Sequence, residues 1–233
     1  MYQTFIYVAI FLIYSFIGWI VEVSAFLIQD HKFVNRGFFI GPVVPIYGTG
    51  GILITLLLTK YQSDPVTLFC MAVVVCSILE YFTSYVMEKL FKTRWWDYSN
   101  KKFNINGRIC LSNLIAFGIL GMFIMYISNP FLIGQLEKLP SLWLNIIFWS
   151  VLSIFVIDNI VSGIINNSIK TTTKQLGEKM DNTEEITKKV REILQKKSAL
   201  HRRLINAYPG LKDIKVKIKK VEQKIDERRK RKE

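Results

Sequence analysis

The chain has 233 residues, 51% of them hydrophobic, and a positive mean hydropathy of +0.27. This composition excludes an ordinary soluble domain and predicts helices that cross a membrane. The net charge of +13 is uneven: residues 1–169 carry ten Lys and Arg against eight Asp and Glu, whereas residues 170–233 carry 21 against ten. The sequence therefore predicts two domains, a nearly neutral membrane part over residues 1–168 and a basic tail over residues 169–233.

Long apolar runs predict an all-α integral membrane protein with about five transmembrane helices. The expected spans are residues 4–28, 42–59, 65–91, 110–127 and 142–165. Asn129-Pro130 is expected to end the fourth span, because the residue before a proline disfavours helix.

The loops differ in charge, and this difference predicts an orientation. Loops 29–41 and 89–109 and the tail are basic, whereas the loops around 60–64 and 128–141 hold one Lys each. Basic segments stay in the cytoplasm. We therefore expect the N-terminus outside and the C-terminus in the cytoplasm.

Three spans each carry an acidic residue: Glu22, Glu80 and Asp158. A carboxylate inside a membrane helix costs a few kcal/mol or more unless it is paired, hydrated or protonated, so it is a candidate functional group. Each acid lies 6–11 residues before the inner end of its span, about 9–16 Å from the cytoplasmic surface at 1.5 Å per residue. We expect one polar cavity open to the cytoplasm; the alternative is that each acid is paired separately as a structural pin.

Glu80 also belongs to a polar stripe on its helix. Ser77, Glu80, Ser84 and Glu88 follow spacings of three and four residues, which place them on one helix face. Glu88 lies near the membrane boundary, where its side chain is expected to reach water at the rim of the cavity.

The segment 35–51, NRGFFIGPVVPIYGTGG, is too rich in glycine and proline for a regular helix throughout. One interpretation is a broken helix start whose free backbone amides face an anion. The alternative is a kinked helix with glycines for close packing. The structural residues expected in this loop are Gly37, Gly41, Pro42, Pro45 and Gly48.

The segment 94–111, RWWDYSNKKFNINGRICL, combines aromatic and charged residues. Trp95, Trp96 and Tyr98 suit a membrane interface, and with Asn106 they are expected to form the cytoplasmic rim. Asp97 among basic residues predicts a salt-bridged loop or a phosphate-binding one. The candidate substrate- or ion-binding residues are Glu22, Glu80, Asp158, Arg36, Arg94, Asp97 and Arg108, with the arginines as counter-charges.

The tail is predicted to form two helices, residues 176–206 and 211–231, each with apolar residues at heptad-like spacing. Tyr208-Pro209-Gly210 breaks the chain between them. An antiparallel, coiled-coil-like hairpin in the cytoplasm would close the two apolar stripes together, and it is also a candidate dimerisation element. The basic run 228–232 fits a solvated end or anionic lipids better than nucleic acid.

Several kinds of chemistry have no support in the sequence. It contains no GxxxxGK[ST] motif, so ATP-driven action would need a separate ATPase subunit. Cys70, Cys76 and Cys110 form no CxxC motif, and His31 and His201 have no ligand spacing. We expect no catalytic residue, metal or cofactor.

The chain resembles the putative ABC-transporter type IV family of small bacterial membrane proteins. The resemblance rests on Gly18-Trp19 with Glu22 and on the segments 35–48, 80–88, 95–99, 104–111 and 202–212. Lys102 and Val44 stand where the family usually has proline and cysteine. The resemblance implies a permease-like role in the bacterial cytoplasmic membrane and supplies no substrate or catalytic residues.

The sequence therefore favours a permease-like transport component with an acidic cavity open to the cytoplasm. One alternative is a membrane enzyme acting on a lipid or lipid-linked phosphate, with the arginines binding the headgroup. Another is a non-catalytic assembly or sensing protein that works through its hairpin. The expected partners are the lipid bilayer, a separate ATPase subunit and further copies of the chain.

Overall fold

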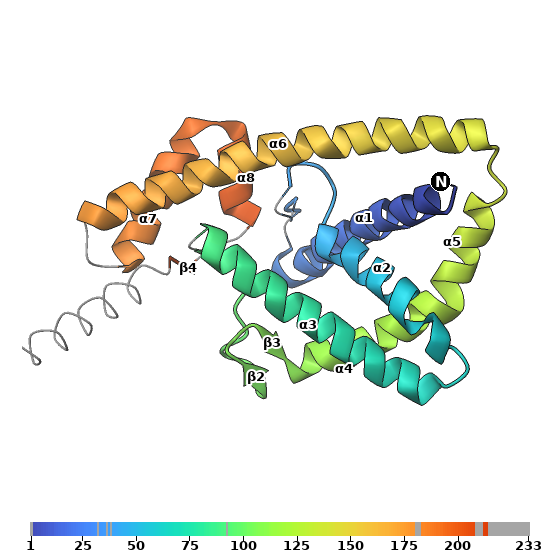
Figure 1. Ribbon diagram of the computed structural model, residues 1–233. Coiled ribbons are helices and arrows are strands. Elements are labelled where there is room, and N and C mark those ends of the chain that lie inside the picture. The colour runs from blue at the N-terminus through green and yellow to red at the C-terminus, as the bar shows by residue number, and fades with distance from the viewer. Residues whose placement is uncertain are drawn as a thin grey trace, which may run out of the picture. The chain divides into compact units, whose positions relative to one another are not determined.

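A computed structural model describes residues 2–31, 33–35, 37, 39–91, 93–179, 183–207 and 212–213. They are mostly helical, as predicted (Figure 1). The described α-helices are α1 (Tyr2–Asp30), α2 (Pro45–Leu58), α3 (Pro65–Phe91), α4 (Leu111–Phe123), α5 (Asn129–Leu136), α6 (Ser141–Lys179), α7 (Thr183–Lys197) and α8 (Ala199–Ala207). The short turns η1 (Thr59–Tyr61, 3₁₀) and η2 (Ile124–Ser128, π) follow α2 and α4.

Two pairs of two-residue antiparallel strands complete the described fold. β2 (Asn104–Ile105) pairs with β3 (Ile109–Cys110), and β1 (Thr93–Arg94) pairs with β4 (Lys212–Asp213). Contacts divide the chain into two compact units, Met1–Thr83 with Asp97–Ser162, and Ser84–Trp96 with Gly163–Glu233.

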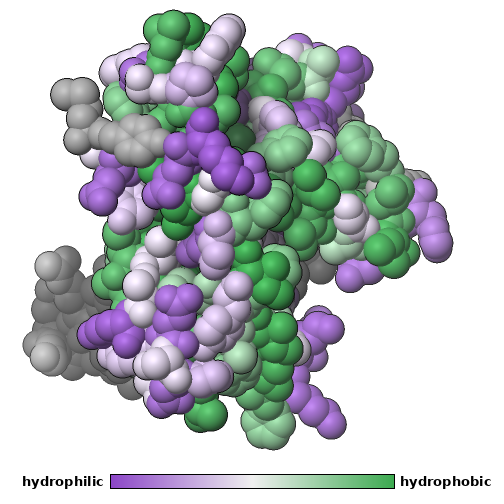
Figure 2. Space-filling model, turned by 90° about the vertical axis from the view of Figure 1, so that its right-hand side faces the viewer, coloured by the Kyte–Doolittle hydropathy of each residue, from purple (hydrophilic) through white to green (hydrophobic). Residues whose placement is uncertain are grey.

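Four helical stretches among the described residues are long and apolar enough to cross a membrane: Gln3–Gln29, Pro65–Leu90, Leu111–Leu136 and Ser141–Ser168. Many of their large apolar side chains are exposed, including Ile154, at 67%, and Ile119, at 60%. Figure 2 shows hydrophobic residues over much of one face of the molecule. Lipid is the environment in which such surfaces are stable, so these features fit a membrane protein.

The predicted end of the fourth span at Asn129-Pro130 is wrong. The helix continues from α4 through the π turn η2 into α5, and Pro130 lies in the first turn of α5. A proline removes a backbone donor and crowds the preceding turn, and the wider π turn supplies the extra room there. Side chains of α1 and α2 also hydrogen-bond to the first residue of α5: the Tyr14 hydroxyl donates to Asn129 Oδ1 at 2.7 Å, and Asn129 Nδ2 donates to Thr55 Oγ1 at 2.9 Å.

The expected second span, 42–59, is an irregular segment followed by α2. At 14 residues α2 rises about 21 Å, less than the roughly 30 Å of a bilayer's hydrocarbon core. Pro45 occupies the first helical turn, where a missing N–H costs nothing. The five-span topology and its orientation stay predictions.

Glycines allow α1 and α2 to pack closely. A Cβ added at Gly48 would lie 2.2 Å from Ser15 Oγ and 2.4 Å from the Phe11 carbonyl oxygen. One added at Gly51 would lie 2.3 Å from the Tyr14 ring, and one at Gly18 the same distance from the Tyr47 ring. Small residues at a helix interface in lipid permit this approach of two backbones. The buried core of the first unit is formed by residues of α1, α2, α3 and η2: Ile6, Ile10, Tyr14, Ile54, Leu58, Leu68, Ala72, Cys76, Ile124 and Met125.

The second unit holds the tail. α6 continues through Gly163 to Lys179, and the described part of 176–206 comprises the end of α6 with α7 and α8 in place of one continuous helix. Of the apolar stripe predicted for 176–206, Val190 is buried, whereas Ile193 and Leu200 are 40% and 38% exposed. Leu194, which does not belong to the predicted stripe, is buried. Of the second predicted tail helix, 211–231, the structure describes only Lys212 and Asp213, in β4. The hairpin stays a prediction, and its second arm otherwise lies outside the described residues.

The topology is testable with three exposed positions, His31, Ser63 and Ser99. In a chain without its native cysteines, we expect His31→Cys and Ser99→Cys to react with a membrane-impermeant maleimide only after the cells are opened. Ser63→Cys should react in intact cells. If α2 does not complete a crossing, His31 and Ser63 will react from the same side, and the five-span prediction fails.

The α1–α2 packing gives a second prediction. Gly48→Ala should lower the free energy of unfolding by about 1–3 kcal/mol, because the added methyl meets a backbone oxygen that cannot move away. Unfolding in mixed detergent micelles measures the loss. Gly134→Ala is the matched control, since nothing lies within 4 Å of a Cβ at that helical position; equal effects of the two substitutions would contradict the packing argument.

Candidate functional site

Glu80 lies on α3 with its side chain only 7% exposed. The Tyr98 hydroxyl donates to Glu80 Oε1 at 3.1 Å, and Asn113 Nδ2 donates to the same oxygen at 3.3 Å. Glu80 Oε2 is buried and has no hydrogen-bond partner among the described residues, and the same holds for Ser77 Oγ one turn earlier. One half of this carboxylate is therefore satisfied and the other half is not.

Glu22 lies on α1 and binds α2. The Tyr47 hydroxyl donates to Glu22 Oε1 at 3.0 Å. Tyr47 is held in position because its ring packs on Gly18, four residues before Glu22 on the same face of α1. The close approach of the two helices thus places the phenol beside the acid.

Glu22 and Glu80 both interact electrostatically with Tyr98 and Tyr47. Burial raises the pKa of Tyr98 above its ordinary value, and the charges of Glu80 and Glu22 raise it further. Tyr47 likewise interacts electrostatically with Glu22, Tyr98 and Glu80. Side chains from α1, α2, α3, α4 and the 93–110 loop therefore form one group, the Glu22–Glu80 cluster, made of Glu22, Tyr47, Glu80, Tyr98 and Asn113.

Asp158 on α6 has a different set of contacts. Its Oδ1 accepts the Ile40 N–H at 2.9 Å and the Ser162 hydroxyl at 3.0 Å, and its Oδ2 accepts the Gly41 N–H at 3.0 Å. The Ile40 N–H also lies 2.9 Å from Ser162 Oγ. The predicted free amides thus face an anion, and that anion is the chain's own carboxylate. Of the three acids expected in one cavity, Glu22 and Glu80 interact electrostatically with the same two tyrosines, Tyr47 and Tyr98, whereas Asp158 binds the backbone of 40–41.

The irregular segment leaves no backbone donor of residues 40–45 without a partner. Ile40 and Gly41 donate to Asp158, Val43 donates to the Gly41 carbonyl at 2.9 Å, and Val44 donates to the Ser15 carbonyl, halfway along α1, at 2.9 Å. Pro42 and Pro45 have no N–H. Backbone without regular structure is tolerated at membrane depth only under such complete pairing.

Other side chains of this segment support the same arrangement. Asn35 accepts from the Trp19 indole N–H at 2.6 Å and donates to the Ile40 carbonyl at 3.1 Å. Gly37 has φ +132°, a conformation that a side chain would strain. Arg36, a predicted counter-charge, lies outside the described residues.

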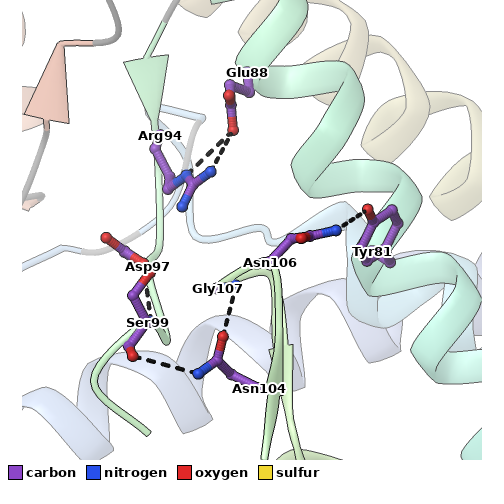
Figure 3. Close-up of polar contacts among 8 residues, drawn as sticks. All are labelled: Tyr81, Glu88, Arg94, Asp97, Ser99, Asn104, Asn106 and Gly107. Atoms are coloured by element: carbon purple, nitrogen blue, oxygen red, sulfur yellow. Dashed lines mark hydrogen bonds and ion pairs between the residues drawn. The ribbon is translucent and has the colours of Figure 1, made fainter. Parts of the chain in front are cut away.

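The predicted rim residues occur in both units. In the second unit, Arg94 Nη2 lies 3.2 Å from Glu88 Oε2 (Figure 3), Trp95 is buried and Trp96 is half-buried. In the first unit, Asp97 Oδ1 accepts the Ser99 N–H at 3.0 Å, and Asn106 Nδ2 donates to the Tyr81 hydroxyl at 2.9 Å. Arg108 is 8% exposed, with its guanidinium 5.7 Å from the centre of the Tyr81 ring.

Sequence reasoning missed several polar partners. Ser162 follows Asp158 by four residues, so the helical spacing alone would have placed it on the same face. Tyr47 and Asn113 have no spacing relation to Glu22 or Glu80, because they come from other elements. No group of His, Cys, Asp and Glu that would hold a metal occurs within the described part of the chain.

A family model described as "Putative ABC-transporter type IV" matches residues 9–163, about two thirds of the chain. The chain belongs to this family. The matched region contains the whole Glu22–Glu80 cluster and Asp158, and it ends before α7 and α8. The family name and the four apolar helices indicate a transport-related membrane protein. No curated protein and no solved structure matches the chain.

The role of Asp158 can be tested by removing its acceptors. We expect Asp158→Ala to lower the free energy of unfolding by about 1–3 kcal/mol, because the Gly41 N–H is left without an acceptor. Amide hydrogen exchange over 39–44 should also accelerate. Asp158→Asn keeps one acceptor oxygen and should have an intermediate effect.

The neighbouring Asn159→Ala is the control, since the Asn159 side chain donates to Phe155 of its own helix. Unchanged exchange over 39–44 in Asp158→Ala, or an equal loss of stability in the control, would show that Asp158 does not hold the segment.

Proposed function

We propose that this family member is a permease-like component of a transport system, in which Glu22 and Glu80 bind a cation or cationic group, or exchange protons. The observation that carries the proposal is the Glu80 carboxylate. It is buried, one of its oxygens has no hydrogen-bond partner, and no basic side chain of the described residues forms an ion pair with it.

The chemistry of the cluster favours a positively charged ligand. A buried carboxylate that lacks half of its hydrogen bonds is costly, and a cation or a proton removes that cost. Glu22 adds a second negative charge nearby, while the Tyr98 hydroxyl and the Asn113 amide supply further polar atoms at Glu80. Asp158, whose oxygens both accept backbone amides, is a structural residue in this proposal.

The construction of the cluster also favours transport over a fixed structural pin. Its five side chains come from four helices and one loop, so a relative shift of any helix changes the surroundings of the acids. Transport requires a site whose exposure changes with such movements. A purely structural hydrogen bond or ion pair would need side chains from only two elements.

The same proposal places the protein in the bacterial cytoplasmic membrane, with its C-terminal tail in the cytoplasm. Because the sequence has no phosphate-binding GxxxxGK[ST] loop, ATP-driven transport requires a separate ATPase subunit that binds the cytoplasmic loops or the basic tail. Copurification of an ATPase with the full-length chain supports this partner, and ATP-independent flux through the purified protein alone contradicts it.

Cation binding can be measured by thermal unfolding in lipid nanodiscs. At constant ionic strength, Na⁺, K⁺ or methylammonium replaces the bulky N-methyl-D-glucamine cation. A cation that binds the folded state should raise the midpoint to saturation, since binding stabilises by about 2.7 kcal/mol at a concentration of 100 times the Kd. Glu80→Gln and Glu22→Gln should abolish or strongly reduce the rise.

Glu192→Gln is the matched control, because that acid lies on α7 with an exposed side chain. Glu80→Gln removes a buried charge and nearly keeps the shape of the side chain, so the midpoint of this variant without cation should not fall. That comparison separates loss of cation binding from misfolding. If the acids exchange protons, a carboxylic-acid stretch titrates in infrared difference spectra and disappears in Glu80→Gln. A saturable shift that survives both substitutions, or the absence of both signals, would refute the proposal.

A further inference from the structure

The β2–β3 hairpin exposes apolar side chains at its start. Phe103 is 78% exposed and Ile105 is 54% exposed, with Asn104 half-buried between them. The hairpin lies in the connection between α3 and α4. The helical stretches on either side, Pro65–Leu90 and Leu111–Leu136, are long and apolar enough to cross a membrane, and if they do, the hairpin lies where they leave the bilayer. Neither apolar side chain belongs to the buried core of the first unit.

Hydrogen bonds within the loop support the backbone around Phe103 and Ile105. The Asn104 amide donates to the Ser99 carbonyl and accepts the Gly107 N–H at 2.9 Å (Figure 3). It also donates to the Lys101 carbonyl at 2.8 Å. Asn106 and Gly107 both have positive φ, 53° and 66°, as a tight hairpin turn requires. Phe103 itself has φ 52°, a conformation that costs free energy for a bulky residue and persists only where surrounding contacts impose it.

The exposed apolar residues at the start of the hairpin lie next to an outward-facing side of α4. The Leu111 N–H donates to the Phe103 carbonyl at 3.3 Å, which joins the hairpin directly to the start of the helix. From there Leu111, Ile115 and Ile119 follow at intervals of four residues and are 44%, 50% and 60% exposed. These side chains face lipid if α4 crosses the membrane, so the exposed surface of Phe103 extends the lipid-facing surface to the membrane boundary.

The charged side chains that directly precede Phe103 are basic, and the acid of this loop, Asp97, binds Ser99. Lys101 and Lys102 are exposed and adjacent to Phe103, and residues 98–113 contain no Asp or Glu. Basic side chains next to exposed aromatic and aliphatic groups match the headgroup region of an anionic membrane, where apolar groups enter the acyl boundary and cations meet phosphates.

We propose that the β2–β3 hairpin is an anionic-lipid binding element. Phe103 and Ile105 insert at the boundary between headgroups and acyl chains, and Lys101 and Lys102 bind the phosphates of anionic phospholipids. This inference concerns the loop's outer surface and does not depend on cation binding at Glu80.

The test uses the full-length chain without its native cysteines, carrying an environment-sensitive fluorophore on Phe103→Cys. Ser99→Cys, an exposed polar position of the same loop, is the control. The protein is reconstituted in phosphatidylcholine nanodiscs with or without phosphatidylglycerol. We expect a blue-shifted emission at position 103, quenched by lipids that carry a spin label near the headgroup, and stronger with phosphatidylglycerol. Position 99 should remain accessible to aqueous iodide.

A second pair of variants separates charge from folding. Lys101→Gln with Lys102→Gln should remove the phosphatidylglycerol dependence at position 103, whereas Lys101→Arg with Lys102→Arg should retain it. If the emission at position 103 indicates the same exposure to water as at position 99, the proposed insertion of Phe103 and Ile105 is overturned. An undiminished phosphatidylglycerol dependence in the Gln variant would overturn the role of the lysines.

Discussion

The arrangement of the first unit depends on the bond between the Asp158 carboxylate and the amides of Ile40 and Gly41. Between α1 and α2 the chain leaves regular structure and reaches halfway along α1, where the Val44 N–H meets the Ser15 carbonyl. A lipid environment tolerates such backbone only if every donor is satisfied. Asp158 supplies the acceptors that no neighbouring strand or turn provides, and the two prolines remove the donors that would otherwise remain.

The position of α2 follows from this constraint. Because α2 begins at Pro45, Tyr47 lies in its first turn, beside Glu22, and Gly48 and Gly51 face α1 at close range. A shift of the start by one residue would turn the tyrosine away from the acid by about 100°, given 3.6 residues per turn. By holding the segment before α2, Asp158 on α6 therefore helps to determine where Tyr47 meets Glu22 on α1.

The three membrane acids thus illustrate two uses of the same group. Asp158 is half-buried and has both oxygens bound to protein donors, which matches the interpretation of such an acid as a structural residue paired within the chain. Glu80 has one oxygen bound and one without a hydrogen-bond partner among the described residues, which is costly unless a ligand or proton completes it. The difference lies in the donors that the surrounding elements present, since the apolar sequences around the two acids are alike. The loop that supplies Tyr98 to Glu80 also carries the proposed lipid-binding hairpin, and its Tyr98 N–H bonds to the Gly107 carbonyl at 2.8 Å.

The sequence by itself determined the helical class, the long apolar helices, the family and the candidate acids, because hydropathy, periodicity and local motifs are properties of neighbouring residues. It also indicated broken structure around Gly41, Pro42 and Pro45, and amides facing an anion were one of the two interpretations that it left open there. It misjudged Asn129-Pro130, because a proline ends a helix only when the turn before it cannot widen. Only the tertiary structure decided that the anion is Asp158 and that Tyr47, Tyr98 and Asn113 surround Glu22 and Glu80. Those pairings join residues 18 to 118 positions apart, and no local pattern encodes them; they follow from the close packing of helices whose contacts form only when the chain folds.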